Sequence, residues 1–340
     1  MREALLYDRL DEQTVLCRLC PWACRMAAGE SGLCEVRQNR EGTLYSLNYG
    51  LISAAAVEPI ERRGLYHLFP GSIILTLGGW GHNLRCRHRP APQALPPEGA
   101  GRRYLDPERA VSFALERHCR GMAWAYQEPA VWLEYVLDTA KLARANGLYT
   151  LMVTSGFLNR EAQDLLGPYL DAWAVELVAA SPQPYQALCA PLPLEAILEG
   201  TAYIREAWRC HVEVHTPLLP GLNDGDEVLR ELAGWIRDHL GPDTPWHLWR
   251  HEPAGEGDPF PPAPLEALEQ ARGIGRESGL RYVYIQAGEQ VGLTPTHCPS
   301  CGSLLIRREG RFYIKTVGLT EDNRCARCGQ EIYLRRSIFK

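Results

Sequence analysis

The chain has 340 residues, of which 46% are hydrophobic and 23% are charged, and its net charge at pH 7 is −5. This composition is typical of a folded soluble protein, and the small negative charge gives no reason to expect binding to nucleic acid or to an anionic membrane surface. No apolar run reaches the roughly 18 residues of a membrane span, and the first residues are charged where an export signal would be apolar. We therefore expect a cytoplasmic protein with no membrane partner.

Cysteines are concentrated at the two ends of the sequence. Of the twelve, four lie in the first 34 residues and four in the last 43. In a chain that is not exported, two such groups indicate metal sites rather than disulfides. The N-terminal group has the spacing C-x2-C-x3-C-x9-C, which matches no common zinc finger and predicts either a zinc site or an auxiliary iron–sulfur cluster. Its members are Cys17, Cys20, Cys24 and Cys34.

Between residues 72 and 287, short apolar runs alternate with amphipathic stretches of helical period. Several runs are apolar almost throughout, as parallel strands buried on both faces are. The expected strands are 72–79, 121–128, 149–156, 172–179, 211–219, 245–252 and 281–287. The expected helices are 107–119, 129–147, 160–167, 193–209, 224–240 and 263–278, the first two opened by prolines.

A repeated strand–helix order implies right-handed crossovers and a parallel α/β sheet. Periodicity does not show whether the sheet closes on itself, so a full or partial (β/α) barrel and an open doubly wound sheet both remain as alternatives. Either arrangement places a ligand at the C-terminal ends of the strands. The Pro- and Gly-rich stretch 89–103 is expected to be a loop. We expect three regions: a Cys-rich extension at 1–70, a barrel at 71–290 and a small terminal module at 291–340.

Two further groups of residues fall within the expected barrel. Three isolated cysteines are expected to be buried thiols: Cys119, Cys189 and Cys210. Three histidines lie in or at the end of expected strands: His215, His247 and His251. With Glu128 or Glu213 they offer a polar or metal site inside the barrel, but hydrogen-bonded interior histidines are the favoured interpretation.

The C-terminal cysteines form two C-x2-C pairs, each followed by a glycine. Two such knuckles supply four thiolates for tetrahedral zinc, and the glycines let the backbone turn toward the sulfurs. The segment 306–315 between them is expected to be a strand or hairpin. The pattern predicts a zinc ribbon, with iron as the alternative metal and a stabilising role favoured over contact with nucleic acid. The four ligands are Cys298, Cys301, Cys325 and Cys328.

Several segments, in order, resemble one known family. They include CRLCPWAC at 17–24, AYQEPAVWLEY at 125–135, EVHTPLLPGLND at 213–224, PWHLWRHEP at 245–253 and the terminal ribbon. The chain thereby resembles the radical S-adenosylmethionine (SAM) component of the AmmeMemoRadiSam system, which is related to the activating enzymes of glycyl-radical proteins. The resemblance implies a partial (β/α)6-type radical SAM barrel, SAM as cofactor, and Memo-type and Amme-type proteins as partners. A shared fold does not by itself imply a shared function.

The family's defining site is a Cys-x3-Cys-x2-Cys loop after the first barrel strand. Its three thiolates hold a [4Fe–4S] cluster and leave one iron free for SAM. Here the three positions fall on His82, Cys86 and Arg89. Arg89 has no available lone pair and stays protonated, so it is not a ligand. His82, Cys86 and His88 offer N, S and N donors, which leaves a mononuclear metal or a mixed-ligand cluster as an alternative.

The resemblance also assigns contacts for a SAM-like ligand. The family's Tyr-Asn-Glu-Pro turn, where the amino group of SAM would be met, is mostly kept at 126–129. Two other site stretches are changed: Asp-Leu-Lys reads Glu-Leu-Val at 176–178, and Ile-Gly-Asn reads Ile-Gln-Ala at 285–287. Changes at the ligand face of a retained scaffold indicate a protein whose chemistry has changed. The candidate ligand contacts are Tyr126, Gln127, Glu128, Thr154 and Ser155.

These observations leave three hypotheses. The favoured one is a radical SAM pseudoenzyme, a non-radical binding or regulatory barrel without the catalytic cluster. The second is an active radical SAM enzyme, of the class that resembles glycyl-radical activating enzymes, whose cluster has unusual ligands or is supplied by the N-terminal cysteines. The third is a mononuclear metalloenzyme built on His82, Cys86 and His88. No catalytic residue, substrate or reaction is assigned.

Overall fold

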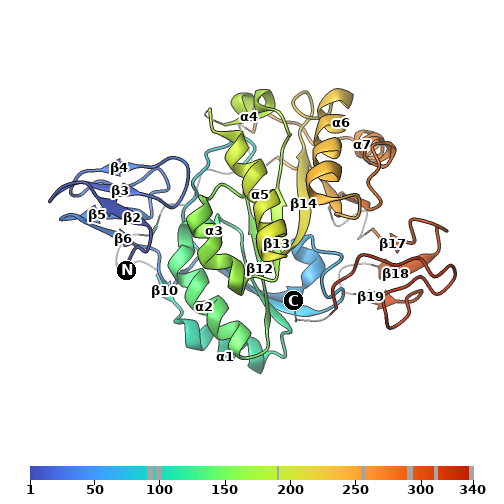
Figure 1. The fold of residues 1–340 in the computed structure, drawn as a ribbon, viewed down its shortest axis with the longest axis horizontal. Helices are drawn as coiled ribbons and strands as arrows, with labels where there is room; N and C mark the ends of the chain where they lie inside the picture. The colour runs from blue at the N-terminus through green and yellow to red at the C-terminus, as the bar shows by residue number, and fades with distance from the viewer. Residues whose placement is uncertain are drawn as a thin grey trace.

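A computed structural model describes residues 1–89, 95–96, 102–189, 191–253, 258–288, 294–309 and 313–336. Figure 1 shows three parts in a row: N-terminal strands on the left, a central α/β part, and C-terminal strands on the right. The expected loop at 89–103 lies largely outside the described residues. Every helix within the described ranges is too short or too polar to cross a lipid bilayer.

The central part is built on one eight-stranded sheet in the order β16-β15-β14-β13-β12-β11-β9-β8. Seven of these strands run parallel, and β8 (Ala54–Pro59) pairs antiparallel with β9 at one edge. In the described part of the chain β8 and β16 do not pair with each other, which makes this a partial barrel. The parallel strands are β9 (Ile73–Gly78), β11 (Gly121–Ala125), β12 (Tyr149–Thr154), β13 (Ala172–Glu176), β14 (His211–Leu218), β15 (Trp246–Arg250) and β16 (Val283–Gln286).

All seven predicted strands and all six predicted helices are therefore present, with ends that differ by a few residues. Asp106 caps the first helix, since its carboxylate accepts from the backbone N–H of Arg109, as a cap should. Pro129 opens a short 3-10 turn before α2 rather than α2 itself. α4 and the edge strand β8 were not predicted from the sequence. The helices are α1 (Pro107–Glu116), α2 (Leu133–Ala145), α3 (Arg160–Leu166), α4 (Pro182–Leu188), α5 (Leu194–Trp208), α6 (Asp226–Trp235) and α7 (Leu265–Glu277).

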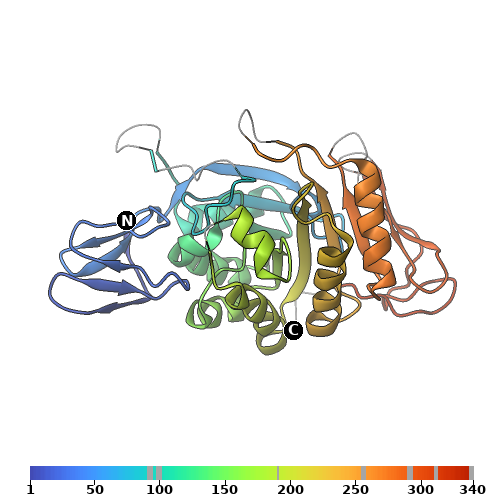
Figure 2. The ribbon, with the colours of Figure 1, turned by 90° about the horizontal axis from the view of Figure 1, so that it is seen from above.

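The two faces of the sheet have different neighbours. Figure 2 shows the helices on one side of the curved sheet and the two terminal modules at its opposite ends. On the other side, the segment after β8 packs Ile60, Leu65 and Phe69 against small strand residues such as Ala123 and Ala174. Alanines leave the space that these larger side chains fill, so the segment occupies the interior of the partial barrel.

The N-terminal module consists of two small antiparallel sheets, ordered β1-β6-β5 and β2-β3-β4. Its strands are β1 (Arg2–Glu3), β2 (Tyr7–Arg9), β3 (Val15–Cys17), β4 (Arg25–Met26), β5 (Arg37–Arg40) and β6 (Thr43–Ser46). A further pair joins β7 (Leu51–Ile52) to β10 (Arg103–Tyr104). The module is attached to the barrel by a buried ion pair in which Arg37 Nη2 lies 2.8 and 2.7 Å from the two carboxylate oxygens of Glu134 in α2.

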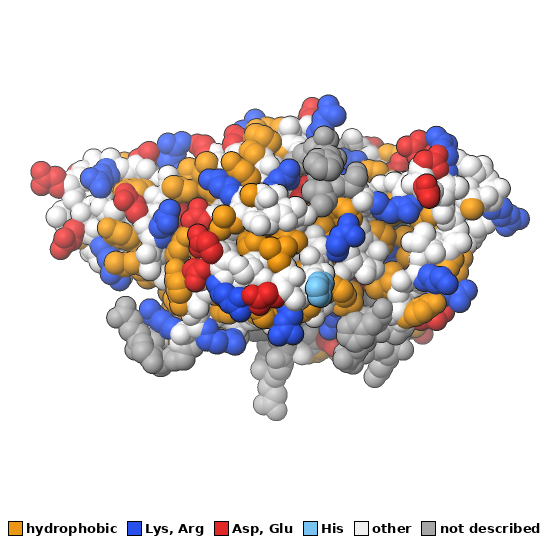
Figure 3. Space-filling model, turned by 90° about the horizontal axis from the view of Figure 1, so that it is seen from below, with side chains coloured by type: hydrophobic (Ala, Val, Ile, Leu, Met, Phe, Trp, Pro, Cys, Tyr) orange, Lys and Arg blue, Asp and Glu red, His pale blue; other side chains and the backbone are white. Residues whose placement is uncertain are grey.

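The C-terminal module is a three-stranded antiparallel sheet of β17 (Thr296–His297), β18 (Leu304–Glu309) and β19 (Tyr313–Thr316). The paired β18 and β19 confirm the expected hairpin. Buried Arg308 donates to the Tyr66 carbonyl (2.8 Å) and to Thr296 Oγ1 (2.7 Å), which joins the module to the segment that fills the barrel. Charged side chains of both signs are interspersed on the face seen in Figure 3, in line with the modest net charge.

Candidate functional site

A hollow of about 610 Å³ opens where β11, β12 and β13 end and where the loop after β9 passes over them. This is the end of a parallel sheet at which ligands bind. It contains the predicted ligand contacts together with most of the degenerate cluster loop. The lining residues are His82, Leu84, Arg85, Cys86, Arg87, Arg89, Tyr126, Gln127, Glu128, Val153, Thr154, Ser155 and Glu176.

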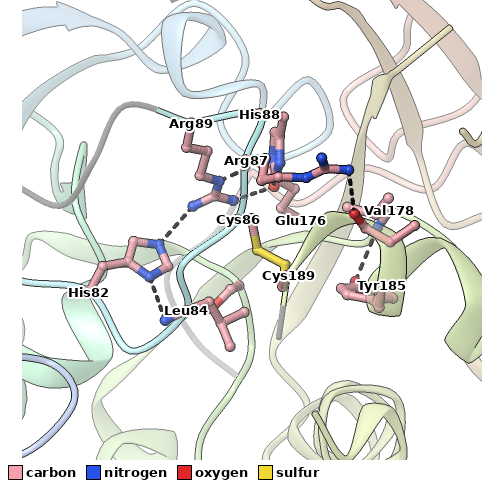
Figure 4. The surroundings of a disulfide bond; sticks show 12 residues. His82, Leu84, Cys86, Arg87, His88, Arg89, Glu176, Val178, Tyr185 and Cys189 are labelled. Carbon is pink, nitrogen blue, oxygen red and sulfur yellow. Dashed lines mark hydrogen bonds and ion pairs between the residues drawn. A yellow bond between two sulfur atoms is a disulfide. The ribbon is translucent and has the colours of Figure 1, made fainter. Parts of the chain in front are cut away.

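An ion pair between Arg89 and Glu176 occupies one wall of this hollow. Burial acts to raise the pKa of Glu176, but Arg89 and His88 together hold it well below its usual range, so the carboxylate stays ionised. Arg89 also places Nη1 2.8 Å from Nε2 of His82, and His88 Nε2 lies 3.3 Å from Glu176. Arg89 and His88 therefore both reach the Glu176 carboxylate at the end of β13, and His82 is linked to it only through Arg89 (Figure 4).

His82 is held as a neutral ring. Burial first, and then the charge of Arg89, lower its pKa to about 4. Its Nδ1 accepts from the backbone N–H of Leu84 at 2.9 Å. A neutral imidazole has one acceptor nitrogen, so only one of its contacts, to Leu84 or to Arg89, is a hydrogen bond in either tautomer.

Cys86 is joined to Cys189 by a disulfide, with their Cα atoms 4.3 Å apart (Figure 4). The expectation that Cys189 is an isolated buried thiol is therefore wrong: it follows α4 directly and lies half-buried beside the loop. The two cysteines are 103 residues apart, and α4 was not foreseen, so no local pattern linked them. Cys119 and Cys210 are buried thiols, as expected, and the Cys210 thiol donates to the Leu170 carbonyl at 3.1 Å.

The donors proposed for a mononuclear metal do not converge. Cys86 is bonded to Cys189, while the Nε2 atoms of His82 and His88 face Arg89 and Glu176. In the described ranges, the group of His, Cys, Asp and Glu ligands whose donor atoms all lie within 4.8 Å is found in the C-terminal module instead.

The predicted ligand contacts at 126–128 and 154–155 do come together. Glu128 is buried, and its carboxylate accepts from Thr154 Oγ1 (2.5 Å), from Ser155 Oγ (2.6 Å) and from the backbone N–H of Ser155 (2.8 Å). It also caps the following turn through the N–H of Ala130. The carboxylate thus organises two strand ends, while the exposed ring of Tyr126 lies in the mouth of the hollow.

The barrel histidines are hydrogen-bonded, as favoured. The Nε2 atoms of His247 and His211 lie 2.7 and 2.8 Å, respectively, from carboxylate oxygens of Glu213. This carboxylate also accepts from the backbone N–H of Tyr66. His215 Nε2 lies 2.9 Å from the Gly64 carbonyl. This polar network joins the strands to the segment that fills the barrel.

The C-terminal cysteines form two matched knuckles. The N–H of Cys298 donates to Ser303 and that of Cys325 to Gln330, both at 2.8 Å, and the glycine after each pair has a positive φ. The four sulfurs all lie within 4.8 Å of one another, with two Sγ–Sγ distances of 3.6 Å. Four thiolates about 2.3 Å from one ion would have such separations, so this group is a metal-binding site.

The N-terminal cysteines line a much smaller cavity together with Trp22, Arg37 and Asn83. Burial raises the pKa of Cys20 to about 12 and that of Cys34 to about 11. No sequence motif identified Arg37 or Asn83, which reach the cavity from β5 and from the cluster loop. The only available signal was the position of Arg37 three residues after Cys34.

Comparisons with known proteins show what this chain is similar to. The family described as the radical SAM superfamily matches residues 83–233. Among solved structures, a radical SAM methyltransferase from Sphaerobacter thermophilus has a TM-score of 0.50 and 18% identity over 69% of this chain and 71% of that one. A domain of pyruvate-formate lyase-activating enzyme from Bacteroides vulgatus ATCC 8482 has a TM-score of 0.43 and 19% identity, covering 48% of this chain and 98% of that one.

Residues 83–233 therefore form a domain of the radical SAM superfamily. Its sequence is 36% identical to the uncharacterized protein MJ0808 of Methanocaldococcus jannaschii, over 98% of this chain and 99% of that protein. At this identity and coverage, the chain belongs to the family of MJ0808.

Proposed function

We propose that this chain is a radical SAM superfamily protein whose barrel binds SAM or a close relative without generating radicals at the loop 82–89. The superfamily implies SAM and an iron–sulfur cluster, and a cluster in this loop needs three thiolates. The observation that carries the proposal is the donor set: Arg89 is an ion-paired cation, and Cys86 is engaged with Cys189. The residues present do not fit a [4Fe–4S] cluster.

Replacing a thiolate by Arg89 does more than remove one ligand. A guanidinium stays protonated under all ordinary conditions, and its charge here is matched by Glu176 at the place where the cluster would lie. A ligand that enters the hollow would meet this ion pair, the ring of Tyr126 and the hydroxyl-bearing turn at 154–155. Charges of both signs suit the ammonium and carboxylate of SAM, so the residues that remain favour binding over cleavage.

Reductive cleavage of SAM gives the decisive test. The wild-type protein is reconstituted anaerobically with iron and sulfide, then incubated with SAM and dithionite, and 5′-deoxyadenosine is measured. We expect no product above a protein-free control. The matched variant carries His82→Cys, Arg89→Cys and Cys189→Ser, which restores the three-cysteine spacing and frees Cys86 from its disulfide, and it should gain a cluster at the loop. Product from the wild type would overturn the proposal and favour the active-enzyme hypothesis.

Ligand binding is tested separately by calorimetry with SAM. We expect Tyr126→Ala to weaken binding several-fold, because its ring is exposed at the mouth of the hollow, where it also packs against the Arg63 guanidinium at 4.6 Å. Tyr104→Ala is the control, since this exposed tyrosine lies outside the hollow. Equal affinities in both variants would contradict binding at Tyr126, and no binding to wild type would contradict SAM as the ligand.

The proposal extends to the family, the compartment, the partners and the metal of the C-terminal module. We propose that the chain is a member of the AmmeMemoRadiSam system, acts in the cytoplasm with Memo-type and Amme-type proteins, and holds zinc on the C-terminal knuckles. The ordered segments that resemble this family support the membership and the partners, and the compact four-sulfur group supports the zinc site. Co-purification of tagged protein with either partner, lost when the partner is absent from the host, tests the assembly.

A further inference from the structure

The N-terminal module places four cysteines around one small enclosed space. Cys17, Cys20 and Cys34 are buried and Cys24 is half-buried. The space is closed on the barrel side by Asn83, from the loop after β9, and by Val131. Trp22, within the same cysteine-rich segment, donates its indole N–H to the Asn83 carbonyl at 2.6 Å. The site therefore lies at the contact between module and barrel, next to the degenerate loop.

The sulfurs here are arranged differently from those of the ribbon. In the described residues, the ligand atoms that all lie within 4.8 Å of one another are those of the C-terminal quartet, so no three of the N-terminal sulfurs meet that separation. A single zinc ion with bonds of about 2.3 Å needs all four sulfurs closer than this. In a [4Fe–4S] cluster each thiolate binds a different iron, so the sulfurs are farther apart.

Arg37 gives a second, independent observation. Its side chain is 1% exposed and lines the cysteine cavity. Nη2 is held by Glu134, whereas Nε and Nη1 are buried without a hydrogen-bond partner. Leaving buried donors of a charged group unpaired is costly. An anionic centre in the cavity, with sulfur acceptors, would satisfy them.

We propose that Cys17, Cys20, Cys24 and Cys34 bind a [4Fe–4S] cluster, with Arg37 donating to its sulfurs. Four thiolates on a cluster core of charge +2 leave a net charge of about −2, which a buried guanidinium partly offsets. Glu134 then holds Arg37 in place and sets how much of its positive charge the cluster experiences. This inference goes beyond the proposed function, because it concerns a cluster away from the loop 82–89 and requires no cleavage of SAM.

The test uses the full-length protein with Cys86→Ser and Cys189→Ser, which removes the loop thiols. After anaerobic reconstitution with iron and sulfide, we expect about four labile sulfides per chain, a visible iron–sulfur absorption band and, after dithionite, an EPR signal of a reduced cluster. Zinc near two per chain without sulfide would overturn the proposal, and so would a sulfide content that survives replacement of all four N-terminal cysteines by serine.

A single substitution guards against failure of the fourfold variant to fold. Cys24→Ser changes only the half-buried ligand, and we expect it to alter the EPR signal while the circular dichroism stays that of the parent. Cys119→Ser is the matched control, because this free buried cysteine lies outside the cavity. An EPR signal unaffected by Cys24→Ser would overturn the assignment.

Charge substitutions test the role of Arg37. Glu134→Gln removes the neighbouring negative charge and should raise the midpoint potential of the cluster, because its reduced form then feels more of the guanidinium. Arg37→Gln should lower the potential. Arg230→Gln, an exposed change on α6, should leave it unaltered. Equal potentials in all three variants would contradict any contact between Arg37 and the cluster.

Discussion

The two cysteine quartets of this chain contrast in almost every physical respect. The C-terminal quartet is compact, partly exposed and built from two knuckles with matching backbone hydrogen bonds. The N-terminal quartet is mostly buried, its sulfurs are wider apart, and a guanidinium faces its cavity. Both lie where a small β-module meets the barrel. The contrast shows that four cysteines define a metal site only together with the separation of their sulfurs and the charge beside them.

The largest expected effect is loss of the ribbon. Cys298→Ser with Cys325→Ser removes a ligand from each knuckle, and structural zinc contributes about 10–16 kcal/mol to the folding of zinc-finger peptides. The ribbon also covers Tyr282 and Tyr284 at the barrel edge, so we expect loss of one zinc per chain and a marked fall in the melting temperature. Metal analysis and thermal unfolding check this. An unchanged zinc content would contradict zinc binding by the C-terminal quartet, and with it the contrast between the two quartets.

The next effect concerns the cation beside the N-terminal quartet. Arg37→Met leaves Glu134 buried without its partner, which costs about 3–5 kcal/mol. The double variant Arg37→Met/Glu134→Leu removes both charges and should recover much of this loss, since replacing a buried ion pair by apolar side chains is often neutral. Urea unfolding measures both. If the double variant regains no free energy of unfolding, Arg37 stabilises the module mainly through a contact other than Glu134, such as one within the cysteine cavity.

The third prediction separates metal ligands from a disulfide. The bond between Cys86 and Cys189 closes a loop of 103 residues, and such cross-links stabilise by about 2–4 kcal/mol. Addition of a reductant should lower the free energy of unfolding of the wild type and leave that of Cys86→Ser/Cys189→Ser unchanged. Alkylation of denatured protein checks the pairing directly: ten cysteines should react before reduction and twelve after it.

The smallest effect is a pH dependence at the ribbon contact. Burial lowers the pKa of His67 to about 3, and its ring lies between Tyr284 and the carbonyl of Tyr333 in the C-terminal module. The folded protein keeps this ring neutral while the unfolded chain takes up a proton below about pH 6.5, so stability falls as the pH falls. Between pH 7 and pH 5 His67 should account for about 2 kcal/mol.

Urea unfolding at the two pH values tests this, with His67→Gln expected to flatten the dependence. His239→Gln serves as the control, because this histidine is exposed on the far end of a helix. A slope that His67→Gln leaves intact would assign the effect to other buried histidines.

Much of the fold could be predicted from the sequence because its signals are local. Each of the seven parallel strands was visible as an apolar run, each predicted helix as a periodic stretch, and the ribbon as two C-x2-C pairs with glycines, whereas the edge strand β8 and the short strands of the N-terminal module were not predicted. The resemblance to a known family singled out 126–128 and 154–155, and both segments lie at one edge because each follows a strand of the same parallel sheet.

Only the tertiary structure decided which distant residues meet. Cys86 pairs with Cys189, Arg89 with Glu176, and Arg37 with Glu134, across 103, 87 and 97 positions of sequence. Such pairs depend on how α4, β13 and α2 pack against the loop and the N-terminal module, which no short pattern encodes. The sequence determined the ligands that this protein offers, because spacing along the chain fixes which side chains are near neighbours. Packing decided which of those ligands remain available, since a thiol or a carboxylate already held by a partner is lost to a metal.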